Sequence, residues 1–243
     1  MGNDLYNVIR IIKRKFDTFQ RDPIGSTKNK ARDQVHWLLS HWGKHKLHQR
    51  GALEALVDFL AIRPPSAIPP NFSDLWFLYK TVRWRNPNII LEFGSGCSTV
   101  ILTQALYDNQ RHSSKSHSYL YSVDADPYWA EVTARTLPTH LRKFCEISYS
   151  PLLEVEYQGI PGFRHANVPN VVPNLVYLDG PPLTPEREVA VDILYIEDKL
   201  PPDFYLIIDG RKNNTMFLKR NLKRRYSFKE RKIFFNYIFQ LGE

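Results

Sequence analysis

The chain has 243 residues, of which 43% are hydrophobic and 24% are charged, a balance typical of a folded globular protein rather than a disordered one. No apolar run approaches the roughly 18–20 residues that span a bilayer, the N-terminus lacks a signal-peptide pattern, and only Cys97 and Cys145 are available for a disulfide. We therefore expect a cytoplasmic protein without a disulfide framework.

The net charge of +8 is unevenly spread, because Arg211–Lys232 holds ten basic residues and a single acid, Glu230. Solvated helix faces are the simplest interpretation of this pattern. Nucleic acid or an anionic membrane surface is the alternative partner that such a charge would attract.

The first 70 residues predict a basic, helical N-terminal extension, and residues 71–243 predict the main domain. Residues 1–25 have the spacing of an amphipathic helix, followed by a break over Asp22–Lys30. A second helical pattern covers Gln34–Leu60, with Gly51 as a point of division. A proline-rich stretch over residues 63–70 separates it from a short helix at Ser73–Val82. An adaptor that docks through the first helix would use the apolar residues Ile9, Ile12, Phe16 and Phe19.

From residue 88 onward strands and helices alternate, which predicts an α/β, Rossmann-like, doubly wound and mainly parallel sheet. The expected strands are Ile89–Glu92, Tyr119–Val123, Phe144–Tyr149, Leu175–Leu178 and Tyr205–Ile208. The expected helices are Thr99–Asp108, Pro127–Leu137, Pro185–Tyr195 (with Thr184 as N-cap) and Thr215–Lys223. Two apolar-aromatic runs in Arg225–Leu241, separated by Lys229–Lys232, predict an antiparallel hairpin at the C-terminus.

The stretch Leu91–Thr99, LEFGSGCST, predicts a ligand site at the end of the first strand. Glycines let the backbone bend sharply and approach a ligand, and the following helix directs its amide groups toward that ligand. A nicotinamide-dinucleotide fingerprint would place a third glycine where this chain has Thr99. Glu92 suits a cationic amino-acid head group instead, such as that of S-adenosylmethionine.

The second strand ends in Asp124-Ala125-Asp126-Pro127, so two carboxylates compete for the ribose hydroxyls of such a ligand. Aspartate followed by proline is a good start for a helix. We therefore assign Asp126 to helix capping and Asp124 to the ribose.

Asp179 and Asp209 follow the fourth and fifth expected strands, so both are expected at the edge of the sheet that carries the site. Either one suits a general base or a group that orients the substrate, with Asp179 the first choice. A capping role is the alternative for Asp179, and a surface pair with Arg211 is the alternative for Asp209. With Asn213 or Asn214, the two aspartates also form an oxygen set that suits Mg²⁺, although no spacing fixes such a site.

Several other polar residues carry weaker predictions. The histidines form a group that suits a surface face better than a transition-metal site: His36, His41, His45 and His48. Cys97 is interpreted as a small packing residue rather than a nucleophile. The insertion Leu152–Asn174 is expected to open toward the site as a loop, with Arg164 and His165 near the acceptor, and Arg187 is a candidate for an anionic group on it.

Taken together, four motifs resemble those of class I S-adenosylmethionine-dependent methyltransferases: LEFGSGCST, SVDADPYW at Ser122–Trp129, LVYLDGPP at Leu175–Pro182 and LIIDGR at Leu206–Arg211. The chain is most similar to members with an Asp-Gly-Pro run after the fourth strand, often found beside sugar-modifying enzymes. The resemblance implies a seven-stranded sheet whose last strand is antiparallel. It also implies that Glu92, Gly94, Gly96 and Ser98 form the cofactor loop, although many relatives have a third glycine where this chain has Ser98.

The resemblance implies an enzyme that transfers a methyl group from S-adenosylmethionine to an oxygen or nitrogen of a small molecule or sugar-type acceptor, such as a polysaccharide precursor. Three alternatives stay open at this point. They are a nucleic-acid methyltransferase that uses the basic C-terminal region, a nicotinamide-dependent oxidoreductase, and a non-catalytic adaptor.

Overall fold

The computed structural model describes residues 25–64, 67–112, 118–182, 184, 189–234 and 236–242, with side chains in the first of these segments from residue 33. The helix expected over residues 1–25 and the predicted role of Arg187 lie outside the described residues. In the described part of the chain, no helix combines the length and hydropathy needed to cross a bilayer.

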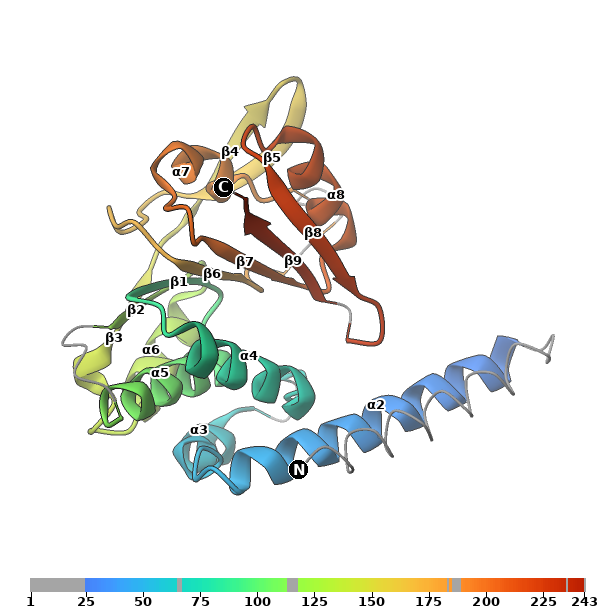
Figure 1. Cartoon of the computed structure of the whole chain (residues 1–243), viewed down its shortest axis with the longest axis vertical. Coiled ribbons are helices and arrows are strands. Elements are labelled where there is room, and N and C mark those ends of the chain that lie inside the picture. Colours follow the sequence, from blue (N-terminus) through green and yellow to red (C-terminus); the bar gives the residue numbers. More distant parts are fainter. Residues whose placement is uncertain are drawn as a thin grey trace.

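A mixed, mainly parallel sheet of seven strands forms the centre of the molecule, in the order β3-β2-β1-β6-β7-β9-β8 (Figure 1). Its strands are β1 (Ile89–Phe93), β2 (Tyr119–Asp124), β3 (Cys145–Tyr149), β6 (Leu175–Leu178), β7 (Tyr205–Asp209), β8 (Tyr226–Arg231) and β9 (Asn236–Leu241). Strand β9 pairs antiparallel with both β7 and β8, and the other pairs are parallel. The predicted strands, the closing hairpin and the antiparallel last strand are therefore confirmed.

Helices cover both faces of the sheet. The α-helices are α2 (Gly25–His48), α3 (Val57–Ile62), α4 (Phe72–Arg85), α5 (Cys97–Gln110), α6 (Pro127–Thr136), α7 (Asp192–Ile196) and α8 (Lys212–Asn221), with short 3₁₀ turns at Glu54–Leu56, Arg142–Phe144 and Glu197–Lys199. Alternate residues of each strand point to opposite faces. Ile90 and Ile207 pack toward α4 and α5, whereas Leu91 and Ile208 pack toward α7 and α8.

The N-terminal helices join the first of these two cores. Leu47 and Leu56 are fully buried in the same cluster as Leu78 of α4 and Val100 of α5. The rest of α2 extends away from the body (Figure 1). The division of the chain at residue 70 stays a prediction.

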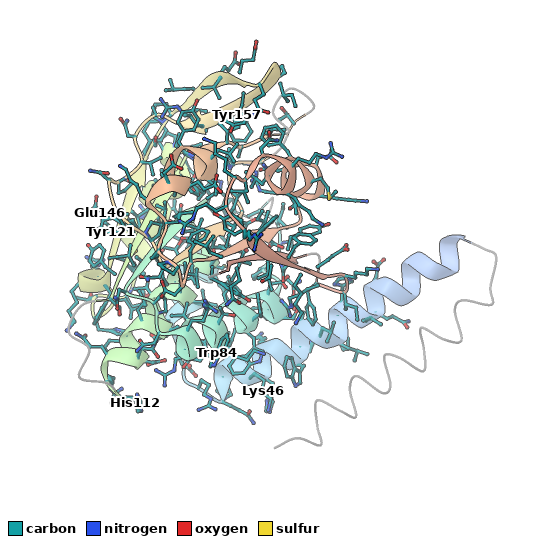
Figure 2. All side chains as sticks on the ribbon, turned by 45° about the horizontal axis from the view of Figure 1, so that its top comes forward. Lys46, Trp84, His112, Tyr121, Glu146 and Tyr157 are labelled. Carbon is teal, nitrogen blue, oxygen red and sulfur yellow. The ribbon has the colours of Figure 1, made fainter. Side chains whose placement is uncertain are left out.

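Helix boundaries in this region differ from those expected. Helix α2 already begins at Gly25, within the predicted break, and Gly51 divides the helical pattern as predicted, with a left-handed φ of 67°. Asn71 is the N-cap of helix α4, and its side chain accepts a hydrogen bond from the Ser73 amide. Asn86 is the C-cap of the helix and has the left-handed conformation. Trp84, in its last turn, is 76% exposed (Figure 2).

The insertion between β3 and β6 is not a simple loop. It forms an antiparallel hairpin of β4 (Leu152–Tyr157) and β5 (Ile160–His165) (Figure 1). The tip of this hairpin, marked by Tyr157, lies at the opposite end of the molecule from Lys46 of α2 (Figure 2). The turn residues Gln158 and Gly159 both have positive φ, as a two-residue hairpin turn requires. Polar and apolar residues alternate along β4, a strand signal that the sequence prediction missed.

The helix expected at Pro185–Tyr195 is confirmed only from Asp192, where α7 begins, and residues 185–188 lie outside the described residues. Residues 189–191 instead run extended beside the insertion hairpin. Phe163 donates its amide to the Val189 carbonyl (2.9 Å) and accepts the Val191 amide (3.0 Å). Two β-branched valines in a buried position favour this pairing over a helical turn. In the C-terminal hairpin, Lys229–Arg231 likewise belong to β8 rather than to the turn.

Candidate functional site

The register of the sheet places four predicted site positions in one row at the carboxyl ends of the strands. Glu92 of β1 pairs with Ser122 and Tyr177, and Tyr177 pairs with Ile207. Two residues further along each strand or its exit lie Asp124, Gly94, Asp179 and Asp209, all on the face of the sheet that α4 and α5 cover. Strand β9 continues the row with Asn236, the register partner of Asp209. The row therefore holds three carboxylates with a glycine among them.

Gly94 is required where it is. Its φ is 96°, a left-handed conformation that favours glycine, and a Cβ atom there would lie 2.4 Å from the amide nitrogen of Gly180. Gly180 in turn has no room for a side chain, because its Cβ would lie 2.3 Å from the Gly94 Cα. The turn after β1 and the turn after β6 thus touch backbone to backbone.

Gly96 and Ser98 begin helix α5, in the same turn. The amide of Gly96 donates to the Thr99 hydroxyl (2.9 Å), and Ser98 is buried in the first turn of the helix. The first backbone amides of a helix have no acceptor within the helix. Those of α5 lie at the end of the sheet that holds the carboxylates, where they can donate to acceptor groups of a ligand.

Glu92 is fully buried beneath the turn. Its Oε2 atom accepts hydrogen bonds from the hydroxyls of Thr99 (2.6 Å) and Ser122 (2.7 Å). Its Oε1 atom has no partner at hydrogen-bonding geometry among the described residues. Burial raises the pKa of Glu92 to about 7, even though the hydroxyls of Ser98, Thr99 and Ser122 act to lower it. The Oε1 atom therefore has an acceptor position left for a further donor.

Asp124 binds the glycine turn directly. Its Oδ2 atom accepts the amide (2.6 Å) and the hydroxyl (2.7 Å) of Ser95, and its Oδ1 atom accepts the Asp126 amide (2.8 Å). A carboxylate offers about four acceptor positions, so one is left for another donor. Asp126 accepts the Tyr128 amide (2.9 Å) ahead of Pro127, which confirms its predicted role as the cap of α6.

Asp179 is held in place through its backbone rather than through its side chain. The guanidinium of Arg211, which is only 4% exposed, donates to the carbonyl oxygens of Asp179 and Pro181. The Asp179 residue itself is open to solvent, although the protein atoms packed around its carboxylate raise its pKa and Arg211 opposes this rise. The predicted surface pair of Arg211 with Asp209 is therefore wrong, because Arg211 is buried and spans the Asp-Gly-Pro-Pro turn.

Asp209 is fixed by two donors. Tyr177 donates its hydroxyl to Oδ2 (3.1 Å), and Asn236 donates its amide to Oδ1 (2.7 Å). Burial and the charge of Asp179 raise the pKa of Asp209 to about 7, and these two hydrogen bonds act in the opposite direction. The pKa of Tyr177 is raised well above its usual value by burial, so its hydroxyl keeps its proton and stays a donor.

Asp74, in the first turn of α4, is an acid of this region that the sequence analysis missed. Its carboxylate is buried and senses the charges of Asp209, Arg231 and Asp179, and one of its oxygens has no partner among the described residues. Burial is the main reason that its pKa is raised to about 8. Only the packing of α4 against the sheet brings it there, and no local motif in the sequence signals that approach.

We expect the buried Asp74 to make the protein less stable as the pH rises. Between the unfolded pKa of 3.8 and the folded value of about 8, the folded state holds a proton that the unfolded state has lost. Each pH unit in this window then lowers the free energy of unfolding by up to about 1.4 kcal/mol. Urea denaturation at pH 5.5 and pH 8 measures this loss, which should be smaller in Asp74→Asn. Asp203→Asn, at an exposed position, is the control, and an equal pH dependence in wild type and Asp74→Asn contradicts the prediction.

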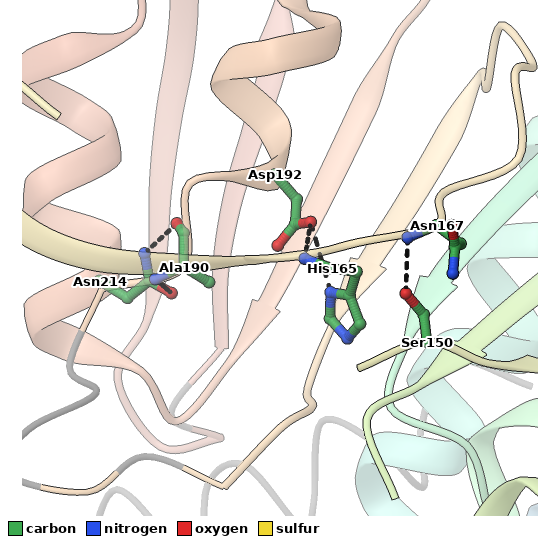
Figure 3. Close-up of polar contacts among 6 residues, drawn as sticks. All are labelled: Ser150, His165, Asn167, Ala190, Asp192 and Asn214. Carbon is green, nitrogen blue, oxygen red and sulfur yellow. Dashed lines mark hydrogen bonds and ion pairs between the residues drawn. The ribbon is translucent and has the colours of Figure 1, made fainter. Parts of the chain in front are cut away.

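A buried polar pair, His165 and Asp192, joins the insertion to α7. The backbone amide of His165 donates to Asp192 Oδ1 (2.8 Å), and the Nδ1 atom of His165 lies 3.3 Å from the same oxygen (Figure 3). The ring of His165 also stacks on that of Phe93. Asn214 bonds both backbone groups of Ala190, and Ser150 accepts the Asn167 amide, on either side of this pair (Figure 3). These contacts join the hairpin to α7 and to the end of β3, and they join the segment before α7 to α8.

Two further expectations for the insertion turn out differently. His165 is fully buried rather than placed on an open loop, and the guanidinium of Arg164 lies over the ring of Tyr195, 5.0 Å from its centroid. The hairpin therefore contributes packing and hydrogen bonds behind the end of β1, on the face opposite Glu92.

The metal-site alternatives find no support in the described residues. No three side chains among His, Cys, Asp and Glu are grouped there so as to hold an ion. Asn214 is committed to Ala190, and His41, His45 and His48 bond separately to Trp37, Gln49 and Glu54. Both cysteines are free, and burial raises the pKa of Cys97 to about 11, so its thiol keeps the proton that a nucleophile must lose.

No protein-family model and no curated protein sequence matches the chain. Solved structures do resemble it. A methyltransferase of Podospora anserina, PaMTH1, bound to S-adenosylhomocysteine, has a TM-score of 0.57 at 12% identity over 91% of this chain and 98% of that one. An O-methyltransferase from Bacillus cereus, in complex with S-adenosylhomocysteine, has a TM-score of 0.51 at 14% identity over 85% and 97%. A methyltransferase from Geobacter sulfurreducens has a TM-score of 0.50 at 12% identity over 84% and 88%. The chain therefore has the fold of these methyltransferases, as its sequence motifs imply.

Proposed function

We propose that this protein transfers a methyl group from S-adenosylmethionine to an oxygen or nitrogen atom of a small-molecule acceptor, a sugar-type molecule among the candidates. The observation that carries the proposal is the row of groups at the strand ends. In the order of the strands, this row consists of Asp124, Gly94, Asp179 and Asp209. The buried Glu92 of β1, with its unpartnered oxygen, lies two residues before Gly94. Ligands of doubly wound sheets bind at the carboxyl ends of the strands, where this row lies. The O-methyltransferase fold of the neighbour from Bacillus cereus supports the oxygen acceptor.

The residues present suit S-adenosylmethionine in chemistry as well as in place. Glu92 offers a buried, partner-free oxygen to an ammonium group, and Asp124 has one acceptor position left for a ribose hydroxyl. Gly94, Gly96 and Ser98 keep the backbone of the turn close to the ligand. When bound, the cofactor supplies a methyl group that its sulfonium has already activated.

The protein's remaining task is to place the acceptor and to accept its proton. Asp179 is the first choice for general base, because the residue is exposed and its raised pKa makes its carboxylate a stronger base. Asp209 is fixed by two donors and is better suited to orient the acceptor. Both assignments follow from position and hydrogen bonding at the acceptor end of the row.

Calorimetric titration with S-adenosylhomocysteine and, separately, with NAD⁺ tests the proposal. Binding of the first ligand alone in the micromolar range supports it. Binding of NAD⁺ alone favours an oxidoreductase, and binding of neither ligand contradicts the methyltransferase proposal.

We expect the affinity for S-adenosylhomocysteine to rise as the pH increases from 6 to about 7.5. Glu92 is protonated below its pKa of about 7 and must ionise to pair with the ligand's ammonium group. Above about pH 8 the affinity should level off, because Glu92 is then largely ionised. Glu92→Gln should remove the rise. 5′-Methylthioadenosine, which lacks the amino-acid head, is the matched control ligand, and the same pH dependence for both ligands contradicts a Glu92–ammonium contact.

A further inference from the structure

A chain of hydrogen bonds links the C-terminal hairpin to Asp209. Arg231 of β8 donates to Asn236 Oδ1 (2.7 Å), and Asn236 of β9 donates to Asp209 Oδ1 (2.7 Å). Asn236 is only 1% exposed, so water does not compete with these bonds. Because a guanidinium has only donors, the amide oxygen of Asn236 must face Arg231 and its NH₂ group must face Asp209. Arg231 thereby ensures that Asn236 presents its NH₂ donor, and not its oxygen, to Asp209.

The guanidinium of Arg231 is itself held in place by aromatic rings. It lies 3.6 Å from the ring centroid of Phe77 on α4 and 4.1 Å from that of Phe234 at the hairpin turn. Phe234 also packs against Val35 and Leu39 of α2. Cation–π contacts at these distances fix the position of a charge without neutralising it. The chain of contacts therefore runs from the N-terminal helices through the hairpin to the strand-end row.

We propose that Asn236 and Arg231 are positioning residues for Asp209, whose carboxylate they orient toward the acceptor end of the site and whose charged form they favour. The proposal rests on the function proposed above, and it extends the site to the C-terminal hairpin. Asn236 acts on the site through Asp209, whereas the charge of Arg231 also acts on the buried Asp74.

The surroundings of Asp209 make this support necessary. The charged or titratable groups that face it are Asp179 and Tyr177 from β6, Arg211 before α8, Asp74 from α4 and Arg231 from β8. Burial and Asp179 favour the protonated form of Asp209, whereas the Tyr177 and Asn236 donors favour the charged form. Without the Asn236 donor, the protonated form of Asp209 would be favoured further, and this form offers an acceptor hydroxyl a donor instead of a carboxylate.

The direct test is a ¹³C NMR titration of the aspartate side-chain carboxyls, in which Asp209→Asn assigns the Asp209 signal. Asn236→Asp keeps the shape of the side chain but replaces the donor with a second carboxylate. We expect the Asp209 midpoint to rise by at least about one pH unit. Arg231→Met, which keeps apolar packing on Phe77, should raise the same midpoint by a smaller amount, and it serves if Asn236→Asp does not fold.

Asn174→Asp is a matched control. Asn174 also donates its amide to a carboxylate, that of Asp203 (3.0 Å), but at the opposite end of the sheet, so the Asp209 midpoint should not move. An unchanged midpoint in both hairpin variants, or an equal shift in the control, overturns the proposal. The titration needs no methyl acceptor, and binding of S-adenosylhomocysteine is measured separately on the same proteins. Failure of the positioning role is therefore distinguishable from failure of the proposed function.

Discussion

Asp124→Ala is expected to weaken the binding of S-adenosylhomocysteine by about 10- to 100-fold. The carboxylate would accept one ribose hydroxyl, and a hydrogen bond to a charged group contributes about 1.5–3 kcal/mol. The same carboxylate holds the amide and the hydroxyl of Ser95, so its loss also releases the glycine turn. Calorimetric titration of wild type and variant at one pH measures the ratio of affinities.

Asp126→Ala provides the control for this experiment. Asp126 lies two residues further along the chain and caps α6 through the Tyr128 amide, without contact to the glycine turn among its hydrogen bonds. Its loss should cost about 1 kcal/mol of stability and leave the affinity nearly unchanged. If both variants bind S-adenosylhomocysteine as wild type does, Asp124 has no role in binding it, and if both lose affinity equally, the assignment of the two aspartates is wrong.

Arg211→Ala is expected to lower the free energy of unfolding by about 3 kcal/mol or more, the cost typical of removing one partner from a buried charged interaction. Arg211 is buried and donates to the carbonyl oxygens of Asp179 and Pro181, and its charge opposes the rise in the pKa of Asp179. The alanine variant leaves both carbonyl groups without their donor and the Asp179 carboxylate without a counter-charge. Urea denaturation followed by circular dichroism measures the change.

Arg142→Ala tests whether this loss depends on burial. Arg142 also donates to two backbone carbonyls, those of Leu137 and Arg135, both at 3.2 Å, but its side chain is exposed. We expect this variant to lose less than about 1 kcal/mol, because water replaces the donor there. Similar losses in the two variants would show that Arg211 makes no special contribution to the turn after β6.

The sequence predicted the sheet well because its central strands β1, β6 and β7 are mostly buried and the strands are separated by strong turn signals. All five parallel strands were placed within a residue or two, and β9 was expected to be antiparallel from the two aromatic runs at the C-terminus. Residues 189–191 were assigned to a helix, but Val189 and Val191 pair with Phe163, a residue of an insertion whose own strands had been overlooked. Such non-local pairing overrides a local helical pattern.

Only those site residues that lie at the ends of strands could be predicted from the sequence. Asp124, Asp179 and Asp209 each end a buried strand, so their common row follows from the periodicity of strands. Asp74 and Asn236 could not be found in this way, because one lies in a helix and the other opens a hairpin strand. A surface pair of Arg211 with Asp209 was one alternative from the sequence, and only the contacts of Arg211 with backbone carbonyls explain its buried place.

The contact between Gly94 and Gly180 has a consequence for engineering. Because each glycine fills the space that a Cβ of the other would need, the two turns cannot be varied independently, and a library that randomises either position would consist mostly of misfolded members. Phe77 and Phe234 contact Arg231 from α4 and from the hairpin, and both are only partly buried. Attempts to vary the strand-end site should therefore leave the glycine pair fixed.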